Sequence, residues 1–217
     1  MSKQIKYRIA TSNDYNSMLE FLRQHYYPEE PLTRATEPLE QDSHDEECNM
    51  SNIAHGTCVI AVVSDEREQI VGVFLAGPKY PDEEKKLLEE ASHIPNTKWS
   101  KALLFLAMLE RDSNVYQKYN VDKAIHGHVL AVDKKFRGNG IGLKLFEKSM
   151  ERAKELGFPL YSTDCTSVYS AQICDRLNME CVNVYAFADY RAPNSDEQVL
   201  FPPGEHKLVK TYAKKLL

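Results

Sequence analysis

Apolar positions in the first half of the chain predict a strand, a helix and a central hairpin. Residues 5–10 form a short run of strand character, and apolar residues then recur at helical spacing over 15–22. Prolines within 28–32 remove backbone donors, so they end that helix and make this segment a rigid bend. The apolar runs 57–64 and 69–77 flank a polar stretch, as the two strands of a hairpin do.

The second half of the chain alternates between predicted helices and strands. Helices are predicted over 81–91, with Pro81 at the first turn, over 100–119, between Gly138 and Gly157 and over 167–177, and strands over 123–132, 159–165 and 179–190. The period of 206–216 fits a strand or a helix. Strands with helices between them predict a mixed α/β (α+β) class with antiparallel and parallel pairings.

Length and composition bound the domain organisation. A chain of 217 residues that is 42% hydrophobic can bury one substantial core, and no linker separates two comparable parts. We therefore expect a single domain over 1–217. Residues 37–47 carry six acidic side chains and little to bury, which predicts a mobile or solvated connection. The alternative for this acidic segment is attraction of a cationic substrate.

Charge and the terminal sequence bear on partners and location. The net charge is −5 with both signs interspersed, so no broad basic face is available for nucleic acid. The first residues lack the apolar core of a secretory signal, and the longest strongly apolar run, 102–109, is too short to span a bilayer. We expect a cytoplasmic monomer without a nucleic-acid or membrane partner.

Cysteine and histidine spacing supports neither a disulfide framework nor a metal site. The five cysteines include no CxxC pair, which favours reduced thiols in a reducing compartment. His126 and His128 form a close pair, but no neighbouring Cys or His completes a ligand set. The sequence therefore predicts no metal.

The segment after the strand 123–132 carries three glycines within five residues, Gly138, Gly140 and Gly142. Glycines leave backbone N–H groups unobstructed, and the helix that begins there directs the positive end of its dipole into the turn. Basic side chains at 134, 135 and 137 add positive charge. The turn suits a pyrophosphate, although glycine-rich turns also occur as plain caps or hairpins. It lacks both a Walker motif and a GxGxxG in the frame of a dinucleotide-binding site.

The turn resembles the signature of the GNAT superfamily of acetyltransferases, R/Q-x-x-G-x-G/A. Arg137, Gly140 and Gly142 occupy the defining positions, after a strand that ends in LAV. The resemblance implies a GNAT fold, with a central mixed, mostly antiparallel sheet flanked by helices, and acetyl-CoA as cosubstrate. It implies that the turn wraps the pyrophosphate and that the strand aligns with the pantetheine arm. The residues implied in cofactor binding are Leu130, Ala131, Val132, Arg137, Gly138, Asn139, Gly140, Ile141 and Gly142.

Other segments resemble the insect-type arylalkylamine N-acetyltransferases within this superfamily. Residues 171–179 are similar to the superfamily's closing A-x-x-L-Y-E-K-L-G-F, and 28–32 resemble the D-E-P-L element of the insect-type enzymes. Residues 165–170 and the tail over 188–216 also match, in the same order. The resemblance covers nearly the whole chain. It implies acetyl transfer to a small primary amine, an arylalkylamine such as dopamine, serotonin or tyramine.

An alkylamine acceptor requires a base, because its pKa of about 10.4 leaves it protonated at neutral pH. Once deprotonated, the amine can attack the thioester directly in a ternary complex, without an enzyme nucleophile. The resemblance assigns the role of base to Glu30, and the alternative is a surface carboxylate in the bend. It assigns the hydroxyls of Thr166 and Ser170 to organising the site, with helix capping by Thr166 as the alternative.

Two further features of the predicted site concern protons. His126 and His128 lie two apart on a strand, so both face one side of the sheet, where they could relay a proton or simply pack. Cys174 stands where many GNAT enzymes place the tyrosine that protonates the departing thiolate. Tyr169, Ser170 or water could replace that acid.

Other functions fit the same scaffold. The chain could acetylate a polyamine or a protein, or it could be a non-catalytic acyl-CoA-binding module. The missing tyrosine favours the non-catalytic module, whereas the retained Glu30, Thr166 and Ser170 oppose it. The expected partners are therefore a small-molecule amine and acetyl-CoA.

Overall fold

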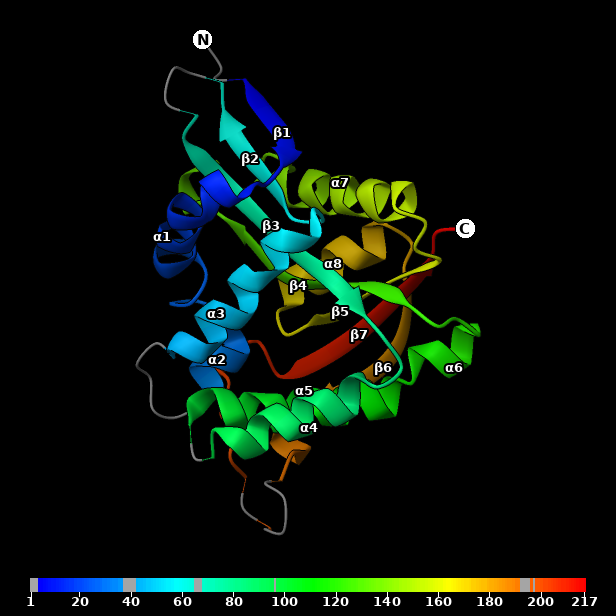
Figure 1. The fold of residues 1–217 in the computed structure, drawn as a ribbon. Helices are drawn as coiled ribbons and strands as arrows, with labels where there is room; N and C mark the ends of the chain where they lie inside the picture. The colour runs from blue at the N-terminus through cyan, green and yellow to red at the C-terminus, as the bar shows by residue number, and fades with distance from the viewer. Residues whose placement is uncertain (1–3, 37–41, 65–67, 96, 192–195, 197) are drawn as a thin grey trace.

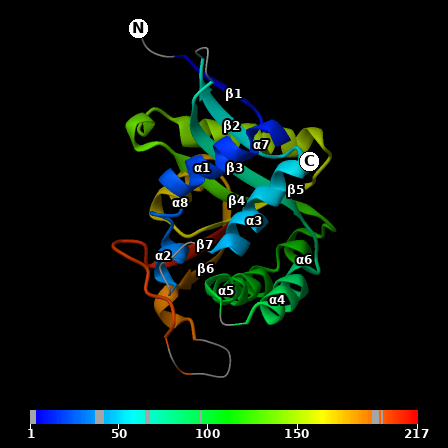
Figure 2. The ribbon, with the colours of Figure 1, turned by 60° about the vertical axis from the view of Figure 1, so that its left-hand side comes forward.

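The fold is built on one seven-stranded sheet with helices on both faces (Figures 1 and 2). The computed structural model describes residues 4–36, 42–64, 68–95, 97–191, 196 and 198–217. The strands follow the order β1-β2-β3-β4-β5-β7-β6 across the sheet. Their bounds are Ile5–Ile9 (β1), Val59–Val63 (β2), Ile70–Lys79 (β3), Ala124–Val132 (β4), Leu160–Cys165 (β5), Glu180–Ala186 (β6) and Leu208–Lys215 (β7).

The strand pairing confirms the expected mixed, mostly antiparallel sheet. All neighbouring strands pair antiparallel except β4 and β5, which are parallel. The predicted hairpin is β2 and β3, and every residue of β2 is buried, as its continuous apolar run requires. The parallel ladder covers only residues 125–127 opposite 161–163. Past this ladder β4 and β5 separate, which opens the sheet at their carboxyl ends.

One face of the sheet is covered by α7 (Ile141–Glu155) and α8 (Val168–Arg176). The apolar side of α7 packs on β2, β3 and β4, with Leu145 and Phe146 buried and the ring of Phe146 4.8 Å from that of Phe74. The helix ends as predicted, at Gly157, which adopts a φ of +74°. This packing sets the position of the glycine turn at the start of α7.

The opposite face carries the remaining layer of helices. Their bounds are Tyr15–His25 (α1), Pro31–Ala35 (α2), Ser43–Ser51 (α3), Glu83–His93 (α4), Lys98–Ser113 (α5) and the short Val115–Tyr119 (α6). α1 contacts β3 and β4, while α5 packs against β6 and pairs with α4. In Figure 1 the α4–α5 pair crosses one end of the sheet and α1 and α3 lie over its middle. The side chains of His126 on β4 and Asp164 on β5 lie close to Glu110 of α5 on this face.

The acidic segment 37–47 differs from the prediction of a mobile or solvated connection. Residues 37–41 lie outside the described part of the chain, but 43–47 belong to α3, where Asp45 and Glu46 are buried. Arg23 of α1 forms an ion pair with Glu46, and Asn49 donates to Asp45. The expectation was wrong for 43–47, because long-range partners supplied the contacts that local composition does not reveal.

Three other elements refine the predictions. The segment 100–119 is divided at Asn114, whose φ of +39° ends α5 and begins α6, and α4 starts after Pro81 with Asp82 as its N-cap. The bend 28–32 contains the start of α2. Residues 208–215 form a strand between β5 and β6, with Thr211, Tyr212 and Ala213 buried, and burial from both sides settles the ambiguous period of 206–216.

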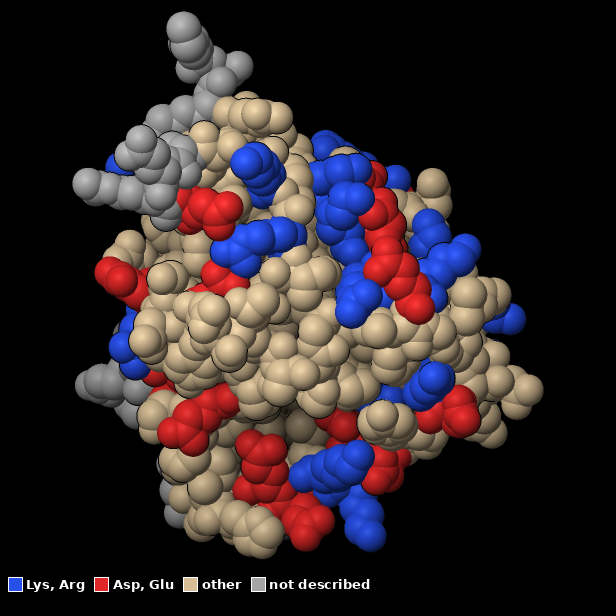
Figure 3. All heavy atoms as spheres, turned by 45° about the horizontal axis from the view of Figure 1, so that its top comes forward, with Lys and Arg blue, Asp and Glu red and all other residues tan. Residues whose placement is uncertain are grey.

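Charges of both signs lie side by side on the face drawn in Figure 3. Along α7 they form i,i+3 pairs such as Lys144 with Glu147 and Lys148 with Glu151. Within the described residues, no helix is both long and apolar enough to cross a membrane.

Candidate functional site

The glycine turn presents an uncapped helix N-terminus. Gly138 and Gly140 adopt φ values of +80° and +74°, and a Cβ at either position would meet no atom within 4 Å. Gly140 is the N-cap of α7 and provides no side-chain hydrogen bond to the first turn. The first amides of a helix have no partners within the helix. The turn therefore offers N–H groups and a helix dipole to an anion, which fits a pyrophosphate.

The opening between β4 and β5 fits an extended acyl carrier. Residues 130–132 pair with β3 on one edge, and their other edge faces the gap beyond the parallel ladder. The N–H and C=O groups on that edge can hydrogen-bond an amide-containing arm, apart from the Val132 carbonyl, which accepts from Arg137. The predicted strand residues Leu130, Ala131 and Val132 precede the predicted turn residues 137–142 along the chain, and we call this strand edge and the turn the cofactor path. A strand edge followed by a helix N-terminus suits the pantetheine arm and the pyrophosphate of acetyl-CoA.

Glu29 holds the basic side chains of the turn. Its carboxylate forms ion pairs with Lys134 at 2.5 Å and with Arg137 at 2.8 Å, and Arg137 also donates to the carbonyl of Val132. Burial opposes ionisation of Glu29, but the hydrogen bonds from Lys134 and Arg137 outweigh it and lower the pKa of Glu29. A phosphate that reaches Arg137 must therefore compete with Glu29.

Glu30, next to Glu29 in the bend, is not a surface carboxylate. It is the N-cap of α2 and is 8% exposed. One carboxylate oxygen accepts from the backbone N–H of Leu32 and from the hydroxyl of Thr166, at 2.7 Å, and the other accepts from the N–H of Thr33. The prolines on both sides of Glu30 fix the entry to α2. These contacts hold a carboxylate next to the carboxyl end of β5.

The two hydroxyl residues predicted for the site, Thr166 and Ser170, have different partners in the structure. Thr166 reaches Glu30, and α8 is capped by Ser167 instead, which accepts from the N–H of Ser170. Helix capping by Thr166 is therefore wrong. The hydroxyl of Ser170 bonds Ser167, and no described contact joins it to Glu30.

His126 and His128 face the same side of the sheet, with ring centroids 5.0 Å apart. Nδ1 of His126 lies 2.9 Å from Oγ of Ser162, and Nε2 lies 3.6 Å from a carboxylate oxygen of Asp164. Burial, with the nearby charge of Lys79, lowers the pKa of His126 well below its usual range and that of His128 to about 3. Both imidazoles are therefore neutral at pH 7.

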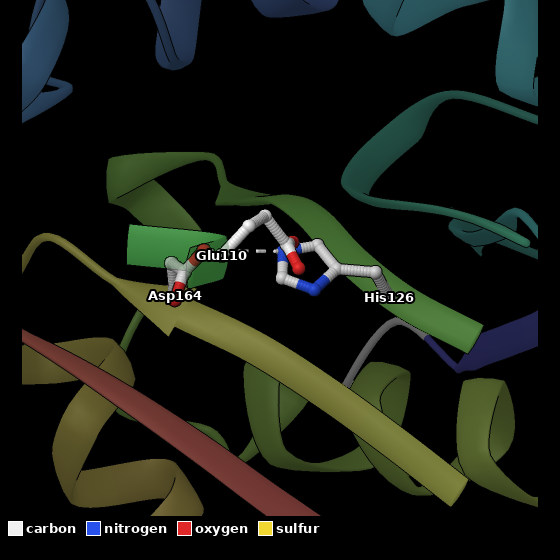
Figure 4. Close-up of side chains that lie close together, drawn as sticks. All are labelled: Glu110, His126 and Asp164. Carbon is white, nitrogen blue, oxygen red and sulfur yellow. Dashed lines mark ion pairs between the residues drawn. The ribbon is translucent and has the colours of Figure 1, made fainter. Parts of the chain in front are cut away.

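A buried ionic cluster adjoins His126 and was not predicted from the sequence. Figure 4 shows Glu110 from α5 and Asp164 from β5 converging on the His126 ring. Lys79, at the end of β3, forms an ion pair with Glu110, and Thr211 donates its hydroxyl to Asp164. Burial raises the pKa of Asp164 above its usual range. The positive charge of Lys79 offsets part of this increase, but the negative charge of Glu110 adds to it. In the sequence Lys79 and Glu110 stand at the ends of apolar runs and Asp164 lies among polar residues, so no local pattern indicates that they meet.

The same cluster bears on metal binding. One ligand atom each from Glu110, His126 and Asp164 lies within 4.8 Å of the others. The ammonium of Lys79 already supplies a cation to Glu110. The cluster is therefore an internal ion-pair network whose three donor atoms are also close enough together to share a metal ion.

A second buried carboxyl group, Asp45, lies on the α3 side of Glu30. One of its oxygens accepts from the side-chain amide of Asn49, which also donates to the hydroxyl of Tyr27. Burial, with the negative charges of Glu30 and Asp42, raises the pKa of Asp45 to about 8. The acceptor side of the site is thus rich in acidic groups.

Cys174, at the position of the usual acid, is enclosed in the core. Its sulfur lies 3.5 Å from that of Cys165, and both thiols are free. The hydrogen bond with Cys165, together with burial, raises the pKa of Cys174. A thiol held in this way is a poor proton donor.

Comparison with known proteins extends these observations. Residues 18–171 match the family described as "Acetyltransferase (GNAT) family". Two solved structures superpose with TM-scores of 0.93, each covering 98% of this chain and 100% of the other. They are a mosquito arylalkylamine N-acetyltransferase-like 5b protein at 35% identity and a Drosophila melanogaster polyamine N-acetyltransferase that forms N-acetylagmatine, at 36%. Arylalkylamine N-acetyltransferase 2 from Aedes aegypti superposes at 0.89 with 28% identity, over 99% of this chain and 100% of that one.

Proposed function

Because the chain belongs to the GNAT acetyltransferase family, we propose that it transfers the acetyl group of acetyl-CoA to a small primary amine, with Glu30 as the base. The observation that carries this assignment is the contact between Glu30 and Thr166, beside the point where β4 and β5 separate. This contact fixes the carboxylate beside the strand edge to which the proposal assigns acetyl-CoA. The same geometry opposes a non-catalytic binding module.

The proposed reaction proceeds by direct attack in a ternary complex. Glu30 accepts a proton from the ammonium, and the freed lone pair forms a bond to the thioester carbonyl carbon. A backbone N–H within 130–132 donates to the developing oxyanion. The carbon–sulfur bond then breaks, the thiolate leaves with its electron pair, and the amine nitrogen releases its second proton to solvent, which leaves a neutral amide. An alkyl thiol has a pKa of about 8.5, so the thiolate can take its proton from water, without Cys174.

The similar structures are named for different classes of amine acceptor. Two of the similar structures are named for arylalkylamines and one for a polyamine activity that forms N-acetylagmatine. The sequence resemblance favours an arylalkylamine such as dopamine, serotonin or tyramine. The carboxyl group of Asp164, whose side chain is 8% exposed, favours an amine with a second positive group, and this is our second candidate. Thiol release with acetyl-CoA and tyramine, dopamine, serotonin, agmatine, spermidine or a lysine peptide will distinguish them.

Glu30→Gln tests the base directly. The amide can still accept from Thr166, but it cannot take a proton, so kcat should fall about a hundredfold or more while acetyl-CoA affinity is retained. Glu89→Gln, an exposed change on α4, is the matched control and should have no effect. Near-normal turnover in Glu30→Gln would remove Glu30 from the mechanism. If no amine in the panel releases thiol from the wild type, the binding-module alternative would replace this proposal.

The expected state and location are part of the same proposal. A monomer acting in the cytoplasm is consistent with a site built entirely from one chain. Sedimentation analysis and cell fractionation test these two points.

A further inference from the structure

Asp164 is a buried carboxylate that shares its nearby ammonium, Lys79, with Glu110. Its side chain is 8% exposed. One oxygen accepts from the hydroxyl of Thr211, and the other lies 3.6 Å from Nε2 of His126, which is neutral. Among the described residues, Lys79 is the nearby ammonium, and it bonds Glu110. Lys79, Glu110 and an ionised Asp164 thus leave one uncompensated negative charge in the interior, which is costly unless a cation pairs with it.

Asp164 also lies next to the site of acetyl transfer. The ladder between β4 and β5 ends at Thr163, so Asp164 is the first residue of β5 beside the opening. Cys165 points to the α8 face, where its sulfur meets Cys174, and Asp164 and Thr166 point to the opposite face. Residues two apart in a strand are roughly 7 Å apart. Because Thr166 holds Glu30, two carboxylates on one face flank the position of the reacting amine.

A short chain with a cation at each end suits two carboxylates that are held two positions apart along the chain, one of them through Thr166. Four methylene groups between two nitrogens span about 6 Å when extended. A protonated amine at Glu30 would place a second ammonium or guanidinium at Asp164. An arylalkylamine would instead bring a neutral ring there and leave the carboxylate without a partner.

On the basis of the function proposed above, we propose that Asp164 determines acceptor specificity by pairing with a second positive group, so that the preferred acceptor is a linear diamine or a guanidinoalkylamine. A charged pair of this kind contributes both affinity and selection against substrates that lack the second charge.

The test compares acceptors that differ only at the far end. We expect the wild type, assayed with EDTA, to show kcat/KM for agmatine and butane-1,4-diamine at least about tenfold above that for butylamine or tyramine. Asp164→Asn keeps an oxygen for Thr211 but removes the charge. It should lower kcat/KM for agmatine about thirtyfold, leave butylamine within about threefold and leave the KM for acetyl-CoA unchanged.

Asp112→Asn, on the exposed part of α5 beside Arg111, is the matched control and should behave as the wild type. A wild type that turns over butylamine or tyramine as well as agmatine would overturn the proposal, and so would an agmatine preference that survives in Asp164→Asn. Failure of the wild type to acetylate any amine would contradict the proposed function instead. In that case, calorimetry of agmatine with the CoA-saturated protein decides the role of Asp164, because loss of binding in Asp164→Asn would support it and unchanged binding would contradict it.

Discussion

Glu30 and Asp45 are neighbouring buried carboxyl groups with very different surroundings. Glu30 receives two backbone N–H groups and the Thr166 hydroxyl. Asp45 receives the Asn49 amide and lies among other negative charges. Hydrogen bonds to a carboxylate favour its charged form, whereas burial and like charges oppose it. Glu30 is thus surrounded by hydrogen-bond donors, whereas Asp45 is a carboxyl group that tends to remain protonated.

Asp45 should make the protein less stable as the pH rises. Burial raises its pKa to about 8 in the folded protein, from an ordinary value of 3.8. Between these values the folded state holds a proton that the unfolded state releases, so the free energy of unfolding falls with increasing pH across this window. Asp45→Asn should flatten that fall by at least about 1 kcal/mol between pH 4 and 8. Urea titrations at each pH measure the free energy of unfolding. An equal dependence on pH in the two proteins would refute the raised pKa of Asp45.

At the scale of elements, α7 combines an uncapped N-terminus with a strongly packed apolar side. The packing of Leu145 and Phe146 fixes the helix, so its free first-turn amides point at a defined place. The contact of Glu29 with Arg137 and Lys134 links this helix start to the bend that carries Glu30. Elements that are far apart in sequence therefore share the cofactor path.

Gly140→Val tests the turn, and Gly157→Val at the other end of α7 is its matched control. Both glycines have a φ of +74° and open space at Cβ, so valine should strain the backbone equally and cost about 1–2 kcal/mol of stability at each. Only the change at Gly140 obstructs the turn, so it alone should raise the Kd for acetyl-CoA, by about tenfold or more. Calorimetry that finds equal affinities in the two variants would place the phosphates elsewhere.

At the scale of the whole molecule, the sheet consists of two parts joined by a short ladder. β1 to β4 form one part and β5, β7 and β6 the other, and three paired positions connect them. α7 and α8 cover one face across this junction, and the acidic acceptor side lies on the other. A ligand in the opening would contact both parts and so stabilise the whole fold.

Acetyl-CoA at about a hundred times its Kd should therefore raise Tm by about 5 °C or more, through binding to the folded state. Hydrogen exchange should slow at 130–132 and in the first turn of α7. Gly140→Val should show a much smaller shift at the same concentration. A shift that is equal in both proteins would show that the stabilisation does not come from the turn.

Local sequence determined most of the elements and the cofactor turn. The hairpin of β2 and β3, the start and end of α7 and the order of strands and helices depend on neighbours a few residues apart, so periodicity and glycine placement predict them. The charged residues of 43–47 led to a wrong prediction of a mobile or solvated segment. Their partners Arg23 and Asn49 come close only when α3 forms and packs on α1. The strand character of 208–215 likewise depended on strands on both sides.

Only the tertiary structure decided how the site is assembled. Glu30 and Thr166 are 136 residues apart, and their contact exists because α2 and the end of β5 meet above the opening in the sheet. Lys79, Glu110 and Asp164 come from three separate elements, and their burial gives Asp164 an uncompensated charge that no local pattern reveals. Sequence determines which groups are present, but distance and burial set their charge states and partners, because both depend on residues remote in the chain.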